Sequence, residues 1–218
     1  MVPPAAVVSP GGGGVAGRGY VRLVSDLPPL TGYAADLHRY LQQGRDALMR
    51  TLDGLGEYDV RRPLVPSGTN LLGLVKHLAG VELAYLVESV GREAPVLPWN
   101  EDGSVWESAD LWATAGESRE HLEGLYRRAW ALSDASLAAV PLDAPAEVAW
   151  WRPETRHTTF GHLVVRVVAE TAQHAGHAEI LRETLDGQAG RDRDAQGGAD
   201  WWEAYVTRIQ AAADTFRD

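Results

Sequence analysis

Leucine and other apolar residues recur at spacings of three, four and seven along most of this 218-residue chain. Such spacing places them on one face of a helix, so the segments must bury these faces against one another. The first segment covers about residues 34–55, and its apolar face consists of Leu37, Leu41, Leu48, Leu52 and Leu55. The second is capped by Ser67 or Thr69 and stops at Gly91, and its apolar face consists of Leu71, Leu74, Leu78, Val81 and Tyr85.

Three further helices are expected after residue 91. The first covers about residues 111–139 and is ended by Pro141. The second covers about 160–185, is capped by Thr158 or Thr159 and is ended by Gly187, and the third covers about 200–216. The loops between them span 93–108, 141–157, with one short extended piece, and 188–198. The sequence therefore predicts an all-α fold, an antiparallel four-helix bundle with an additional C-terminal helix packed alongside and long connecting loops.

The first 30 residues differ from the rest of the chain. They are mostly Pro, Ala, Val and Gly, with the run 11–14 of four glycines and no periodic pattern. A signal peptide would need a basic start and a longer apolar region. We expect residues 1–30 to form a flexible N-terminal extension, although it could also dock on the body, and residues 31–218 to form one bundle domain.

Charge and composition exclude several classes of partner. Acidic residues outnumber basic ones 30 to 20, giving a net charge of −10, and no basic cluster could neutralise several phosphates. The longest apolar runs, 71–75 and 163–168, are far shorter than the roughly 20 residues that cross a bilayer. We therefore expect no nucleic acid and no membrane as partner, and a cytoplasmic monomer or homodimer. The absence of cysteine means that any thiol chemistry needs a thiol from outside.

Histidines and a carboxylate supply the candidate chemistry. Glu170, His174 and His177 follow one another at i, i+4 and i+7 in the fourth long helix, within an arc of roughly 60°. His77 lies near the apolar face of the second helix and could meet Glu170 and His174 in a bundle. Such a site would hold a metal on three protein ligands and leave one position open for water or substrate.

Each of these residues also has an ordinary structural interpretation. A single histidine near an apolar face is more often a hydrogen-bonded core residue than a ligand, and His162 could either line the same cavity or start the helix. The remaining histidines lie beside charges or in loops and are expected at the surface: His38, His121 and His157. The loop tryptophans Trp99, Trp150 and Trp151 either pack or form the wall of a substrate pocket at one end of the bundle.

Three segments resemble a known family. Residues 68–82 (GTNLLGLVKHLAGVE), 110–118 (DLWATAGES) and 169–187 (AETAQHAGHAEILRETLDG), with the closing Trp201-Trp202 helix, resemble the actinobacterial branch of the DinB-like helical bundles over about residues 33–215. This superfamily includes mycothiol-dependent maleylpyruvate isomerase and the mycothiol and bacillithiol S-transferases. The resemblance implies a divalent metal, most often zinc or else nickel, at one end of a four-helix bundle.

The resemblance also implies particular ligands. His77 matches the histidine that the family supplies from its second helix, and Glu170 with His174 matches the pair of the maleylpyruvate isomerase type. His177 is an extra group that either replaces Glu170 or acts as a catalytic hydrogen-bond partner or base. A glutamate ligand makes the site less selective for zinc. Trp150 and Trp151 are the residues expected to bind the cosubstrate.

A thiol transferase is the function that these expectations favour. A metal with one open position can bind a low-molecular-weight thiol as thiolate, and the resemblance implies mycothiol, whose sulfur would attack an electrophilic small molecule. The alternatives are a mycothiol-dependent isomerase, a metal-dependent hydrolase that uses hydroxide, and a non-catalytic metal-binding stress protein. Consumption of thiol with a generic electrophile separates the transferase from the last two.

Overall fold

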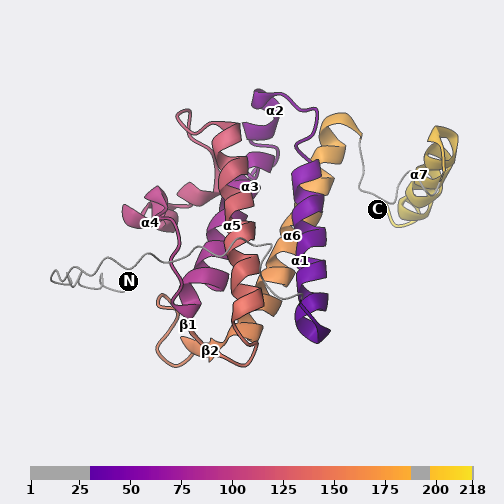
Figure 1. Cartoon of the computed structure of the whole chain (residues 1–218). Coiled ribbons are helices and arrows are strands. Elements are labelled where there is room, and N and C mark those ends of the chain that lie inside the picture. The colour runs from indigo at the N-terminus through magenta and orange to yellow at the C-terminus, as the bar shows by residue number, and fades with distance from the viewer. Residues whose placement is uncertain (1–29, 188–196, 218) are drawn as a thin grey trace, which may run out of the picture.

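The computed structural model describes residues 30–187 and 197–217, so the expected extension 1–30 lies almost entirely outside the described residues. Four long helices form the body of the molecule (Figure 1). They are α1 (Gly32–Arg50), α3 (Leu71–Glu82), α5 (Arg119–Ala139) and α6 (Phe160–Asp186). α1 packs mainly on α6, and α3 packs mainly on α5. The predicted four-helix bundle is confirmed.

The helix ends follow local capping chemistry. The Asn70 side chain caps α3 by accepting the backbone N–H of Gly73 at 2.8 Å, so the predicted cap at Ser67 or Thr69 is wrong. α6 begins as expected, with Thr159 as its cap, and it ends where Gly187 adopts a φ of +76°. At the end of α1, the last turn after Arg50 leads to Gly54 and is not part of the helix.

The third long helix starts later than its apolar pattern predicts. Ser118 caps α5 by accepting from the His121 N–H at 3.0 Å, so the helix begins at Arg119 and not near residue 111. The Thr114 N–H donates to the Glu117 carboxylate at 2.7 Å and closes a separate turn before the helix. Residues 109–111 form only a single 3₁₀ turn.

The long loops contain several short elements. These are α2 (Glu57–Arg61), α4 (Pro98–Glu101), a 3₁₀ turn at Ser104–Glu107, and two strands, β1 (Pro145–Glu147) and β2 (His157–Thr159). The strands pair antiparallel with Ala146 opposite Thr158. The single extended piece expected in the 141–157 loop is therefore one half of a small two-stranded sheet.

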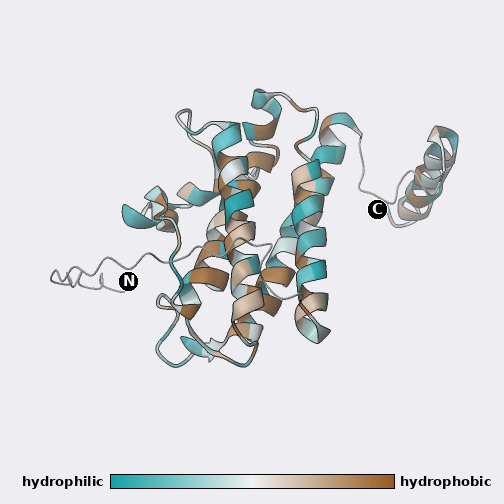
Figure 2. Ribbon diagram, in the orientation of Figure 1, coloured by the Kyte–Doolittle hydropathy of each residue, from teal (hydrophilic) through white to brown (hydrophobic). Residues whose placement is uncertain are grey.

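Figure 2 shows apolar and polar stretches alternating along the long helices, in line with the periodicity of the sequence. One charged cluster nevertheless lies inside the bundle. The guanidinium of Arg45 is fully buried, bonds both oxygens of Glu82 at 2.9 and 2.6 Å, and bonds Asp134 at 2.8 Å. Burial opposes the positive charge, but the two carboxylates outweigh it and raise the pKa of Arg45. This cluster joins α1, α3 and α5.

The C-terminal helix α7 (Ala199–Asp214) is present as expected, but it does not pack as expected. None of its residues is buried, and Figure 1 shows it apart from the bundle. None of the described helices is both long and apolar enough to cross a membrane.

Candidate metal centre

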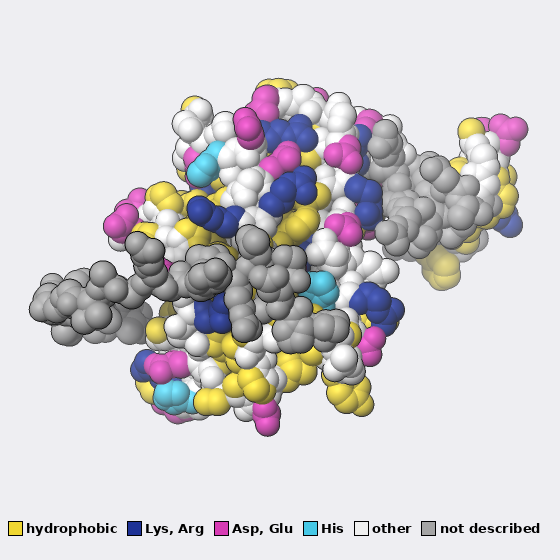
Figure 3. Space-filling view, viewed as in Figure 1, with side chains coloured by type: hydrophobic (Ala, Val, Ile, Leu, Met, Phe, Trp, Pro, Cys, Tyr) yellow, Lys and Arg dark blue, Asp and Glu magenta, His cyan; other side chains and the backbone are white. Residues whose placement is uncertain are grey.

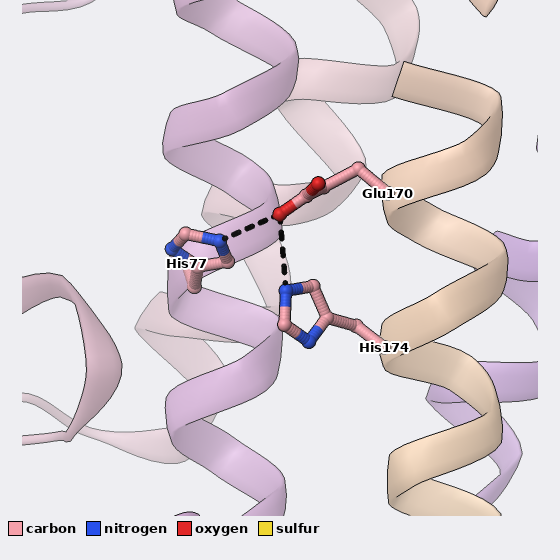
Figure 4. Close-up of side chains that lie close together, drawn as sticks. All are labelled: His77, Glu170 and His174. Carbon is pink, nitrogen blue, oxygen red and sulfur yellow. Dashed lines mark hydrogen bonds and ion pairs between the residues drawn. The ribbon is translucent and has the colours of Figure 1, made fainter. Parts of the chain in front are cut away.

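His77, Glu170 and His174 come together between α3 and α6, with one potential ligand atom of each within 4.8 Å of the others. Figure 4 shows the three side chains pointing toward one another across the gap between the two helices. A Glu170 oxygen lies 3.2 Å from Nε2 of His174 and 3.7 Å from Nε2 of His77. The two imidazole rings meet edge to face at 5.0 Å.

A hydrogen bond from outside this group fixes the His77 ring. Its Nδ1 lies 2.6 Å from an oxygen of Asp110, a half-buried carboxylate in the loop before α5. Nδ1 of the ring thus faces Asp110, and Nε2 faces Glu170 on the other side. This is the arrangement that orients metal-binding histidines in proteins.

The loop that carries Asp110 is anchored on α3 by close contacts. A Cβ at position 73 would lie 1.9 Å from the carbonyl oxygen of Leu111, so Gly73 allows the loop to lie directly on the helix. Lys76, the only lysine of the chain, is buried beside His77 and bonds Glu117 at 2.9 Å and the carbonyl of Trp112 at 3.1 Å. These contacts fix the position of Asp110 relative to His77.

The environment of His174 favours a neutral ring. Its Nδ1 is buried and has no hydrogen-bond partner among the described residues. Burial, together with the neighbouring His77, lowers the pKa of His174 despite the opposing effect of Glu170. Neutral imidazole is the form that binds metals.

A cavity of about 400 Å³ opens beside His77 and Asp110. Four large aromatic residues contribute to its walls, namely Tyr85, Trp99, Trp106 and Trp150. The Glu88 carboxyl also lines it, and burial raises the pKa of this group. One wall is a turn of π-helix over Leu83–Val87, which continues α3 and carries Tyr85. Such turns recur at functional sites.

The other predicted site residues lie around this centre. His177 is exposed, with its ring 5.5 Å from that of His174, and it is not one of the three clustered ligands. Trp150 lines the cavity, whereas Trp151 stands behind it and donates from Nε1 to the Tyr85 hydroxyl at 3.3 Å. His162 packs edge-on against Trp151, with ring centres 6.2 Å apart.

The three histidines expected at the surface divide into two groups. His157 is 73% exposed, and His121 is also exposed. His38 is less exposed, at 32%, and its Nε2 lies 3.2 Å from the half-buried Asp134.

Three residues of the site, Asp110, Tyr85 and Glu88, were not predicted from the sequence as site residues. The spacing of Tyr85 and Glu88 could have indicated them, because they follow His77 by eight and eleven residues and so lie on its side of a helix. No comparable spacing connects Asp110 with His77, because 33 residues of chain separate them.

The comparisons with known proteins bear on this geometry. The model of the mycothiol S-transferase family matches residues 36–187, which contain every side chain of the centre. The chain belongs to the mycothiol S-transferase family. This places it among the enzymes, as a transferase, and confirms the DinB-like resemblance.

A crystal structure of a conserved protein from Enterococcus faecalis has a fold similar to this mycothiol S-transferase family member. The TM-score is 0.56 at 16% identity, and the alignment covers 73% of this chain and 100% of the other, so the likeness concerns the fold alone. No curated protein matches the chain. Helix α7 lies beyond the part that the family model matches.

Proposed function

We propose that this chain is a metal-dependent mycothiol S-transferase whose divalent cation, zinc or nickel, is held by His77, Glu170 and His174. The observation that carries the proposal is the convergence of three potential ligand atoms within 4.8 Å, with Nε2 of His77 facing the Glu170 carboxylate. A cation between these atoms would be attracted by the carboxylate and by both imidazoles in their neutral form. The donor set of two imidazoles and one carboxylate suits zinc and related divalent ions.

The chemistry needs a thiol that the chain lacks, and mycothiol is the proposed source. A bound divalent cation would lower the thiol pKa from about 8.5, so that the sulfur is anionic at neutral pH. In the transfer, a sulfur electron pair forms the new C–S bond, and the leaving group departs from carbon with its own electron pair. The thiol proton passes to a base, for which we propose His177 beside His174.

The cavity beside His77 is the proposed place of the electrophile. The aromatic residues in its wall suit a flat or apolar small molecule. Trp150 would contact the bound molecules directly, and Trp151 would support the wall through its hydrogen bond to Tyr85.

The test measures metal content and thiol consumption on the same samples. Protein loaded with zinc or nickel is mixed with mycothiol and an aryl chloride, and free thiol is followed over time. Because the chain has no cysteine, all thiol lost comes from mycothiol. We expect one metal per chain and rapid thiol loss, with both abolished in His77→Ala and His174→Ala while the helical content stays nearly intact.

The matched control is His157→Ala, which removes an exposed histidine and should change neither readout. Full metal occupancy in His77→Ala or His174→Ala would remove the proposed centre. Turnover of an ester without thiol would indicate the hydrolase instead, and metal binding without any turnover would indicate a non-catalytic protein.

A further inference from the structure

Helix α7 carries an apolar face, and none of the residues on this face is buried. Trp201, Tyr205, Ile209, Ala212 and Phe216 recur at spacings of three and four, so they lie on one side of the helix and its last turn. Trp201 and Ile209 are 39% and 52% exposed, and Phe216 is 85% exposed. Figure 3 shows hydrophobic side chains at the surface of α7. A face of this size on an isolated helix indicates a missing partner.

The outward side of α6 carries an apolar stripe, flanked by the exposed Arg166, Gln173 and His177. The stripe consists of Val165 and Ile180, which are 55% and 64% exposed, the exposed Ala169 and Ala172, and the half-buried Gly176. The opposite side of α6 is buried in the bundle. An outward helix face normally carries charged and polar residues, so a stripe of five apolar or small residues along it is unusual.

The two faces can be paired in an antiparallel register. In an antiparallel pair, residues closer to the N-terminus of α6 lie opposite residues closer to the C-terminus of α7. The pairs in this register are Ile180 with Trp201, Gly176 with Tyr205, Ala172 with Ile209, Ala169 with Ala212, and Val165 with Phe216. Small residues at the centre of α6 thus face the large Tyr205 and Ile209, which allows the helices to approach closely.

We propose that α7 packs on the outer face of α6 of a second copy of this chain, and that two such contacts form a symmetric dimer. In this structure α7 lies apart from its own bundle, which leaves the outer face of α6 open to another molecule (Figure 1). The helix lies beyond residues 36–187, which the family model matches.

The available area is sufficient for a stable dimer. Two copies of α7 supply six aromatic side chains, and such a side chain can bury about 150–250 Å². Because about half of this surface is already covered, the six contribute on the order of 600 Å². The facing residues of α6 add a similar area when they are covered. The total buried area then reaches the lower end of the roughly 1,200–2,000 Å² that specific interfaces bury. A reciprocal exchange also closes the assembly at two copies.

Cross-linking between two different single variants tests the proposal directly. Because the full chain has no cysteine, Ala172→Cys and Ile209→Cys each introduce a single thiol at facing positions of the register. Under mild oxidation, we expect the mixture to give a product of twice the chain mass, in excess of either variant alone. Gly124→Cys on α5 mixed with Ile209→Cys is the control and should give no such excess.

Sedimentation equilibrium of the intact protein provides the second measurement. The wild type should be a dimer, and Gly176→Leu should raise its dissociation constant at least tenfold, because the leucine occupies the place of Tyr205. Gly124→Leu is the matched control, since a Cβ at either glycine meets open space in the monomer. A monomeric wild type, a dimer insensitive to Gly176→Leu, or no cross-link in the mixture would overturn the proposal. The Ala172→Cys/Ile209→Cys double variant gives a further check. A disulfide that forms within one chain, in place of the cross-link between two chains, would also overturn the proposal.

Discussion

At the scale of single residues, the contact between His77 and Asp110 couples the candidate metal centre to a loop of the cavity. We expect Asp110→Asn to lower metal affinity about 10- to 100-fold, because the neutral amide supports the basicity of the ring less than a carboxylate does. Competition with a chelator of known affinity measures the change. Asp143→Asn, at an exposed loop position, is the control, and equal affinities of the two variants would contradict this role.

Glu170 and His177 offer a second prediction at this scale. Glu170→Ala should lose most of the metal affinity, because one of three ligands is removed, whereas His177→Ala should retain the metal and change the rate of thiol transfer or its pH dependence. Metal titration and a pH profile of each variant give the ranking. The reverse ranking would replace Glu170 by His177 in the ligand set.

At the scale of elements, the buried Arg45 holds α1 against α3 and α5. Arg45→Met should cost about 3–5 kcal/mol in the free energy of unfolding, because it leaves the carboxylate of Glu82 buried without a partner. Urea unfolding measures the change. The control is Arg39→Met on the same helix, which breaks only an exposed pair with Asp36 and should cost less than about 1 kcal/mol. Similar costs for the two variants would contradict the proposed stabilisation.

Asp134 adds a pH dependence to the same cluster. Burial alone would raise its pKa, but hydrogen bonds and charge from His38 and Arg45 outweigh burial and lower it. A carboxyl with a lowered folded-state pKa stabilises the protein above its unfolded value of about 3.9, and this contribution is lost as the pH falls through the folded value. The wild type should therefore exceed Asp134→Asn in unfolding free energy near pH 6, by a margin that shrinks toward pH 3. Urea unfolding at several pH values checks this, and a constant margin would contradict it.

At the scale of the whole molecule, the sequence predicts the bundle well because helices that pack on one another have apolar residues at regular spacings in the sequence. The four long helices and the convergence of His77 with Glu170 and His174 follow from these spacings. Helix starts are less certain, because several polar residues near each start compete as caps, and Asn70 is the one whose side chain accepts the hydrogen bond.

Contacts made by loops could not be predicted in the same way. Asp110 reaches His77 because Gly73 lets the loop lie on α3 and Lys76 anchors it, and neither contact has a periodic signature. The packing of α7 was also wrongly expected, because an amphipathic pattern shows that a helix has a partner but does not identify it.

The most direct test of the central claim, that His77, Glu170 and His174 hold a divalent metal, is a crystal structure of the metal-loaded protein recorded at the absorption edge of the metal. We expect one anomalous peak at about 2.0–2.2 Å from Nε2 of His77, Nε2 of His174 and an oxygen of Glu170, with His177 beyond about 3 Å. A peak bound by His177 in place of Glu170, or located away from these three side chains, would contradict it.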